Sequence, residues 1–554
     1  MTAAEEDLPT SEKTVPAVTP EWNPSRHQLA IMAVLSTLSL MVALDACIIV
    51  TSLSAIVSDL KGSTTQGFWV GTAYLLANAV SMPSIASLSD IFGRPVCLVS
   101  SVGVFALGSL ICCLATNMGV LIVGRSLQGV GGAGIIILSL VIFTDLVPLR
   151  FRPKWYGTVL GAWALGNCAG PVIGGAIAQM ATWRWVFYIM FPFCGGGLLL
   201  IPWLVTLRPP TASVGEKLGR VDWLGSSSFI SSATLFLIAV SWGGIQFRWL
   251  SAATLVPLCL GAAGLLWTAA YECLFAREPF LHLGLFWNAS SAATYLCGAI
   301  QGLVIYGQLY YVPFYFLAVK GYSPIQTGLV LLPVMVTLVP GSILTGLLVT
   351  RTNDYRYPIW AGWVLTTVAS GLTLIWNVDT PAALWATTLV LLGFGHGAIL
   401  NAQNFASQAM CNRGEEGTAA AMYGFLRQLG MAIGVGVGGS AFQNMMSLKL
   451  RWEGLPTGIA AESESLIAEL LRLPDNSAFK SRVLDAYVFG FRGVFAVYVA
   501  ISGAALLLSL LIKRFELDKE LQTDHRLAGE GERPITVRMR TIVNLQGRRA
   551  EEHP

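Results

Sequence analysis

The chain has 554 residues, of which 54% are hydrophobic and only 12% are charged, whereas about 25% of a soluble chain is charged. Together with a mean hydropathy of +0.64, this composition predicts an integral membrane protein. The formal net charge of +3 and the scattered basic residues argue against a nucleic-acid partner. The ten cysteines form no CxxC motif and no cluster with histidine, so we expect no metal site.

Apolar segments follow one another along most of the chain. The segment before Gln28 is polar and acidic at its start, so the first apolar segment must direct membrane insertion. Fourteen segments have about the 20 residues that a membrane-spanning helix needs. They begin near Gln28, Phe68, Pro95, Val120, Trp155, Trp185, Trp223, Ser251, Ser291, Thr327, Pro358, Ala382, Thr418 and Gly493. Basic residues gather in alternate short loops, such as those with Arg94 and Arg150, which predicts that both termini are cytoplasmic.

The spacing of the segments predicts the domain organisation of an all-α membrane protein. We expect a disordered cytoplasmic N-terminus at 1–27, a six-helix half at 28–206, and a cytoplasmic linker with two inserted helices at 207–275. A second six-helix half follows at 276–512, with a long external loop at 448–491, and a disordered cytoplasmic tail covers 513–554. In that loop, SLIAELLRL has leucines at helical spacing, which favours a helix on the membrane surface over a solvated loop.

An internal repeat links the two halves at one fixed offset in sequence, which we call the repeat offset. It carries Gly166, Gly170, Gly174 and Gly175 onto Gly430, Gly434, Gly438 and Gly439, and it carries Gly129, Gly131 and Asp90 onto Gly393, Gly395 and Asp354. One register that holds over separate regions indicates duplication of six spans. Because an even number of spans separates the copies, both insert with the same orientation, which predicts a rocking carrier with its site between the halves.

The run GVGGAG at Gly129–Gly134 has the G-x-G-x-x-G spacing of a dinucleotide-binding loop. A nucleotide site would require a preceding strand and a βαβ unit, but this run lies inside an apolar segment that continues as IIILSLVIF. We therefore interpret it as a surface for close helix packing.

Asp45 and Arg125 are ionisable residues inside predicted spans, where a charge costs at least about 2.5–3.5 kcal/mol. Each lies about seven residues from the outer end of its span, which places both roughly 10 Å deep. If they meet, alternate pairing and release could load and unload a proton; the alternative is a permanent ion pair that holds two helices. The repeat offset carries them onto Leu309 and Leu389, so we expect coupling to reside in the first half.

Two further motifs predict moving parts. In SDIFGRP, Asp90 and Arg94 flank the turn residue Gly93, and this acid and base can clamp helix ends as a cytoplasmic gate. Within the fifth span, Pro171 joins the dense glycines Gly166, Gly170, Gly174 and Gly175, which favours a hinge over ordinary glycine packing.

Polar and aromatic residues inside spans are candidates for a substrate cavity. They are Tyr74, Asn78, Gln128, Trp163, Asn167, Gln301, Gln308, Tyr311, His396, Asn401, Asn404, Gln408 and Arg427. Their mixture suits an uncharged or weakly charged amphipathic molecule. For His396 we favour a hydrogen-bonded packing role over a proton relay.

The motifs together resemble the major facilitator superfamily, in particular its branch of fourteen-span drug:proton antiporters. The resemblance covers about residues 28–512. It rests on LDACIIV at Leu44–Val50, SDIFGRP, RSLQGVGGAG from Arg125, GNCAGPVIGG at Gly166–Gly175, WRWVF at Trp183–Phe187 and FLRQLGMAIGVGV from Phe425. The sequence departs from the pattern at Ala86, Ile91, Pro95 and Met190. Ala86 replaces a glycine, and Ile91 and Pro95 replace residues that are commonly basic, which weakens the basic cluster of the loop motif.

The resemblance implies a monomeric plasma-membrane carrier, similar to fungal pumps for toxins and secondary metabolites, that exports a small organic compound in exchange for protons. It implies no cofactor beyond the proton gradient. The alternative on the same fold is an importer or vacuolar carrier of iron chelates or basic amino acids. An ATP-driven exporter is disfavoured because the chain has no G-x-x-x-x-G-K-[ST] motif.

Overall fold

The computed structural model describes residues 22–207, 213–243, 246–276, 279–412, 414–474 and 477–517. Most of the two predicted disordered termini, residues 1–21 and 518–554, lies outside these described residues. Within them the fold is helical, and the nearest approach to a strand is an isolated bridge between Gly243 and Phe247.

The first half begins with long helices that are capped by local sequence. Ser25 and Ser63 accept the backbone N–H three residues on, and Gln28 and Gln66 return the contact, so both helices start with a capping box. Gly93, at φ 102°, ends the second helix and starts the third, a conformation that disfavours any side chain. The helices are α1 (Arg26–Asp59), α2 (Thr64–Phe92), α3 (Arg94–Cys113), α4 (Met118–Leu146), η1 (Leu149–Phe151), α5 (Arg152–Met180), α6 (Trp185–Tyr188) and α7 (Phe191–Leu204).

The linker and the second half complete the chain. The linker contains α8 (Val214–Arg220), α9 (Trp223–Trp242) and α10 (Ala252–Leu274), and the short helix η2 (Leu283–Phe286) follows at the start of the second half. The second half contains α11 (Ala289–Ala318), α12 (Pro324–Val330), α13 (Leu332–Thr352), α14 (Arg356–Thr373), α15 (Ala382–Met410), α16 (Glu416–Trp452), α17 (Gly458–Ala461), α18 (Ser463–Arg472) and α19 (Ala478–Ser509).

Twelve segments of the described residues are helical, long and apolar enough to cross a membrane. The chain is therefore a multi-pass membrane protein. Two further predicted spans coincide with α11 and α14, which are helical but fall outside this set. Glutamines and tyrosines dilute the apolar content of α11, and α14 is 18 residues long and begins with arginine.

Helix packing follows the internal repeat. In the first half the most extensive pairs are α1 with α5, α3 with α4 and α2 with α4; in the second they are α11 with α16, α14 with α15 and α13 with α15. The repeat offset carries each pair of the first set onto a pair of the second. The duplication inferred from glycine spacing is thus matched in three dimensions.

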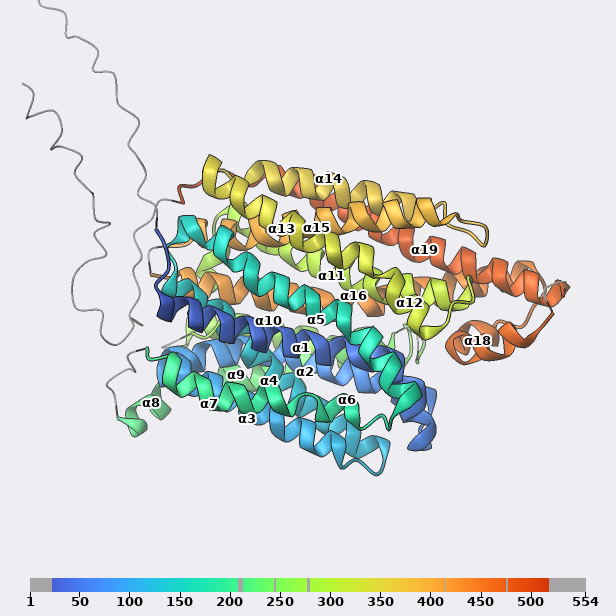
Figure 1. The fold of residues 1–554 in the computed structure, drawn as a ribbon, viewed down its shortest axis with the longest axis horizontal. Coiled ribbons are helices and arrows are strands. Elements are labelled where there is room, and N and C mark those ends of the chain that lie inside the picture. The colour runs from blue at the N-terminus through green and yellow to red at the C-terminus, as the bar shows by residue number, and fades with distance from the viewer. Residues whose placement is uncertain are drawn as a thin grey trace, which may run out of the picture.

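The halves meet along two seams, α5 against α13 and α2 against α16, which the repeat offset also exchanges. Helices α9 and α10 pack on each other, and α9 contacts α2 and α16, so the inserted pair lies beside the second seam. Figure 1 shows α8 and α18 at opposite ends of the bundle. We call the end with α8 and the start of α5 the Arg152 end.

The predicted external loop is shorter than expected, because α16 continues to Trp452 and α19 begins at Ala478. Between them α18 forms the expected amphipathic helix, but Leu470 is buried and Leu466 and Ile467 pack against the second half. Its apolar face therefore covers protein, which differs from the predicted position on the membrane surface.

Candidate functional site

The predicted pair of charges meets in the interior of the first half. Arg125 on α4 donates from Nη1 to Oδ2 of Asp45 on α1 at 2.7 Å, and both side chains are almost wholly buried. Gln128 accepts from the same Nη1 at 2.8 Å and donates to Oδ1 of Asp45 at 3.1 Å and to Ser109 at 2.8 Å. The guanidinium also lies over the Tyr74 ring, 4.3 Å from its centroid. Gln128 thus belongs to the charge network, whereas we expected it in the cavity.

Close helix packing makes this network possible. A side chain at Gly129 would meet the backbone oxygen of Tyr74 on α2, and one at Gly131 would meet the backbone of Phe105 on α3, both at 2.5 Å. The GVGGAG run is therefore a contact surface, as predicted, and its glycines let α4 carry Arg125 between α1 and α2.

The glycine-rich segment of α5 packs along α1. A side chain at Gly166 would meet the backbone oxygen of Leu40 at 2.5 Å, and Gly170 lies against Cys47. The carbonyl of Pro171 accepts from Thr51 at 2.9 Å. These contacts explain why α1 and α5 approach so closely.

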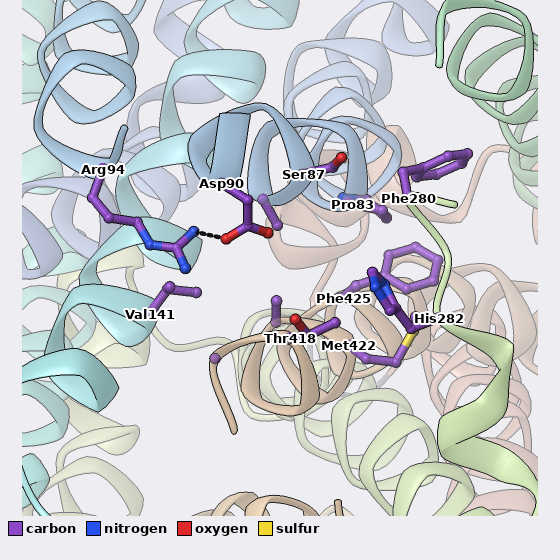
Figure 2. A pocket seen from close by; sticks show the side chains of 13 residues that line it. Pro83, Ser87, Asp90, Arg94, Val141, Phe280, His282, Thr418, Met422 and Phe425 are labelled. Carbon is purple, nitrogen blue, oxygen red and sulfur yellow. Dashed lines mark ion pairs between the residues drawn. The ribbon is translucent and has the colours of Figure 1, made fainter. Parts of the chain in front are cut away.

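A second charge cluster surrounds the start of α3. Arg94 pairs with Asp90 at 2.5 Å and with Asp145 of α4 at 3.2 Å, so it joins the ends of α2, α3 and α4. Figure 2 shows the ion pair of Arg94 and Asp90 beside a pocket that Met422 and Phe425 of α16 close from the opposite side. The pocket has about 410 Å³ of empty space, part of it open to solvent. The predicted clamp therefore lies at the seam between the halves.

The counterpart of Asp90 in the second half also forms an ion pair. Asp354 lies between α13 and α14, and its Oδ2 accepts from Nη2 of Arg356 at 2.9 Å. Burial raises the pKa of the Asp354 carboxyl, but the hydrogen bonds from Arg356 outweigh that effect, and the pKa is lowered from its ordinary value of 3.8.

A residue outside the predicted site connects the halves. Arg152, 2% exposed, donates to the carbonyls of Val147 and Thr144 at 2.6 and 2.7 Å and to the side chain of Gln408 on α15 at 2.7 Å. The repeat offset carries Thr144 onto Gln408, so one guanidinium joins equivalent points of the two halves. Glu416, the equivalent of Arg152 itself, is close enough to interact with it electrostatically.

Two more contacts close the Arg152 end. Asn401 donates to the carbonyl of Pro153 at 3.1 Å and to that of Ser342 at 2.8 Å. Thr350 donates to the carbonyl of Arg150 at 3.3 Å. The structure therefore represents a conformer in which the halves are hydrogen-bonded to each other at this end.

Several predicted cavity residues instead support the packing of one half. Gln308 donates to Ser370 and Tyr311 donates to the carbonyl of Val435, both within the second half. Oδ1 of Asn404 accepts a hydrogen bond from Nε2 of Gln408. This contact orients Gln408, whose side-chain oxygen accepts from Arg152.

Other predicted cavity residues have polar atoms without a partner. His396 is fully buried, and neither ring nitrogen has a hydrogen-bond partner in the described part of the chain, so the predicted hydrogen-bonded packing role is wrong. The side-chain amides of Asn78 and Gln301 and the hydroxyl of Tyr74 are likewise buried and lack a partner among the residues that the structure describes. Asn167 differs, because its Oδ1 accepts from the Cys47 thiol at 2.9 Å.

Trp163 of α5 and Arg427 of α16 face each other across the halves. The guanidinium lies 5.4 Å from the ring centroid, and both residues are partly exposed. Tyr306 of α11, which we did not predict, lies near Arg427 and near Cys47 of α1. Aromatic and polar side chains from four helices thus lie near one another where the halves meet.

These features define a helical membrane carrier built from two related halves with polar groups between them. Residues 29–435 match the family model of the Major Facilitator Superfamily. The chain belongs to this superfamily, whose members are transporters of small molecules that need no cofactor; it is not an enzyme.

Similar proteins agree with this assignment. The chain is 37% identical to the MFS transporter L2 of Phoma sp. over 91% of its length and 85% of that protein. It is 33% identical to the MFS-type efflux pump LUC4 of Fusarium sp. over 95% of the chain and 94% of the relative. A bacterial homolog of the human lysosomal transporter Spinster, solved inward-facing and occupied, has the same fold at a TM-score of 0.55 and 17% identity, covering 89% of this chain and 98% of that one.

Proposed function

We infer that the chain is a proton-coupled exporter of amphipathic organic compounds that works by alternating access. The observation that carries this inference is the buried pair of Asp45 and Arg125. A carboxylate held beside a cation releases its proton readily, and the same carboxylate takes up a proton when the cation moves away. The printed name of the relative from Fusarium sp., an MFS-type efflux pump, favours export. Toxins or secondary metabolites are the cargo that the resemblance to fungal pumps implies.

The finer topology belongs to the same proposal. Adding α11 and α14 to the twelve candidate spans gives fourteen spans, two six-helix halves around the inserted α9 and α10, with both termini cytoplasmic. The concentration of Arg94, Arg150, Arg152 and Lys154 at the Arg152 end supports a cytoplasmic location for that end. Export of toxic compounds from the cell favours the plasma membrane, with the vacuolar membrane as the alternative. We expect a monomer, because both halves of the carrier lie in one chain.

The proposed transport cycle depends on two contacts that break and re-form, the pair of Asp45 with Arg125 and the hydrogen bond of Arg152 to Gln408. With the outer side open, Asp45 takes up a proton, its pairing with Arg125 weakens, and cargo leaves. With the Arg152 end open, Asp45 releases the proton, pairs again with Arg125, and cargo enters. Opening of that end requires the contact between Arg152 and Gln408 to break.

The remaining predicted residues have supporting roles in this cycle. Asp90, Gly93 and Arg94 keep the ends of α2, α3 and α4 together as a cytoplasmic gate. The glycines of α5 and Pro171 let α5 shift against α1. Tyr74, Asn78, Trp163, Gln301, His396 and Arg427 line the path of the cargo.

Transport into inside-out membrane vesicles tests this proposal. An acidic lumen should drive accumulation of amphipathic fluorescent compounds, and a protonophore should abolish it; vesicles without the protein are the control. Accumulation that the protonophore leaves unchanged would contradict proton coupling. Accumulation restricted to right-side-out vesicles would favour the importer on the same fold.

A further inference from the structure

The arginines of the membrane domain differ in how their charge is neutralised. Arg94 pairs with two carboxylates, Arg125 pairs with Asp45 and Gln128, and Arg152 donates to three oxygens. Arg427 makes none of these contacts. In the part of the chain that the structure describes, its guanidinium lies against the ring of Trp163, no carboxylate is within ion-pair distance, and Nε is buried without an acceptor.

The position of Arg427 is set by the symmetry of the fold. The repeat offset carries Trp163 onto Arg427. Because the two halves are parallel repeats, equivalent positions are related by an axis along the membrane normal, and equivalent residues that touch must lie next to that axis. Arg427 and Trp163 are therefore at the centre of the carrier, between the halves.

The neighbours of Arg427 are neutral and can form hydrogen bonds. His396 is close enough to interact electrostatically with Arg427, and its ring nitrogens have no partner in the described residues. Tyr156, Tyr306 and Tyr423 also interact electrostatically with the guanidinium. A cation without a protein acceptor, next to an aromatic ring and spare polar groups, is a site for an anion that carries a ring.

We propose that Arg427 and Trp163 form the binding site for cargo, and that the cargo is an amphipathic organic anion, with a carboxylate or an acidic enol or phenol beside an aromatic or conjugated system. The anionic group pairs with the guanidinium and displaces it from the indole, and the conjugated system stacks on Trp163. This assignment rests on the proposed export function but narrows it, since the composition of the cavity residues alone favoured an uncharged or weakly charged compound.

Equilibrium binding to the purified full-length protein in lipid nanodiscs tests the charge preference. Three probes share one ring system and differ in their head group: naphthaleneacetic acid, naphthaleneethanol and naphthaleneethylamine. The acid should bind most tightly. Arg427→Gln should weaken the acid by about tenfold to a hundredfold, as expected for a lost charge-assisted hydrogen bond, and leave the alcohol unchanged.

Variants separate charge from folding and from ring stacking. Arg427→Lys should recover most of the preference for the acid, whereas Trp163→Ala should weaken acid and alcohol alike. Arg451→Gln, on the exposed end of the same helix, is the matched control and should change neither. The ratio of acid to alcohol affinity, measured on one preparation, does not depend on the fraction of protein that is folded.

The outcomes distinguish the anion site from the export function. Equal binding of the three probes, tighter binding of the amine, no saturable binding of the acid, or an unchanged ratio in Arg427→Gln would each overturn the anion site. If a proton gradient still drove the alcohol into vesicles with the protein, but not into vesicles without it, export would stand without the anion site. If the acid bound through Arg427 but no gradient moved it, the site would stand and proton-coupled export would fail.

Discussion

Replacement of Asp45 by Asn removes the carboxylate that pairs with Arg125 in the interior of the first half. The amide keeps an oxygen for hydrogen bonding, and Arg125 retains Gln128, the carbonyl of Val70 at 3.3 Å and the Tyr74 ring. Loss of one partner from a buried ion pair costs about 3–5 kcal/mol, and these remaining contacts favour the lower end of that range. The variant should therefore fold with reduced thermal stability.

The effect on transport should be larger and of a different kind. A difference of one pH unit is worth about 1.4 kcal/mol per proton, which supports about a tenfold concentration ratio for a cargo exchanged against one proton. With the membrane voltage clamped at zero, wild-type inside-out vesicles should reach that ratio for each unit of pH difference. Vesicles with Asp45→Asn should reach a ratio near one while still equilibrating cargo.

Two further variants separate a coupling role from a structural one. Asp59→Asn changes a carboxylate on the same helix whose side chain is 54% exposed, so it should retain full coupling. Adding Arg125→Met to Asp45→Asn removes the unpaired cation, and thermal stability should recover while coupling stays lost. Gradient-driven accumulation by Asp45→Asn at the wild-type ratio would refute the reasoning, because the pair would then be a permanent structural contact.

Three other predictions concern the remaining contacts. Gln408→Glu gives the Arg152 guanidinium a charged acceptor, which should raise thermal stability and lower turnover about tenfold. The control Gln326→Glu, at an exposed capping position, should change neither quantity. A gain in both thermal stability and turnover by Gln408→Glu would contradict the prediction. Gly166→Ala places a methyl against backbone and should lower the melting temperature in detergent, unlike Gly195→Ala, where the space is open. Asp354→Asn should lower the free energy of unfolding near neutral pH. Because the pKa of the carboxyl is lowered in the folded state, the stabilities of wild type and variant should converge only as the pH falls below about 4. A constant difference in stability across a pH series would argue against the ion pair.

Much of the fold and part of the site could be predicted because they depend on local or periodic features. Apolar segment lengths gave the helices, and the glycine register gave the two related halves. Counting residues from the ends of the spans placed Asp45 and Arg125 at one depth but could not establish contact; the structure joins them at 2.7 Å. The repeat offset also relates Trp163 to Arg427, and equivalent positions meet where they lie next to the axis, but the sequence does not show which positions lie there.

The rest depends on contacts between distant residues. Arg152 in the sequence is one of several basic loop residues, and only its position next to Gln408, 256 residues away, buries it. The sequence does not show which residues surround His396, because that depends on the rotation of α15 about its axis. In the fold, neither ring nitrogen has a hydrogen-bond partner among the described residues. The non-helical part of the predicted loop 448–491 could not be delimited from the sequence, because α16 and α19 remain helical beyond the apolar residues that marked their spans.

An anionic cargo constrains how exchange with protons can work. A bound anion makes a nearby carboxylate hold its proton more tightly, which by itself would favour moving both in the same direction. Exchange therefore requires that Asp45 sense the cargo through a movement of helices. Helix α5 provides the connection: it carries Trp163 at the cargo site and, one turn later, Asn167, which accepts from Cys47 two residues after Asp45 on α1. In the proposed cycle, a cargo that separates Trp163 from Arg427 would shift α5, and the glycine packing of α5 on α1 would pass that shift to the helix that carries Asp45.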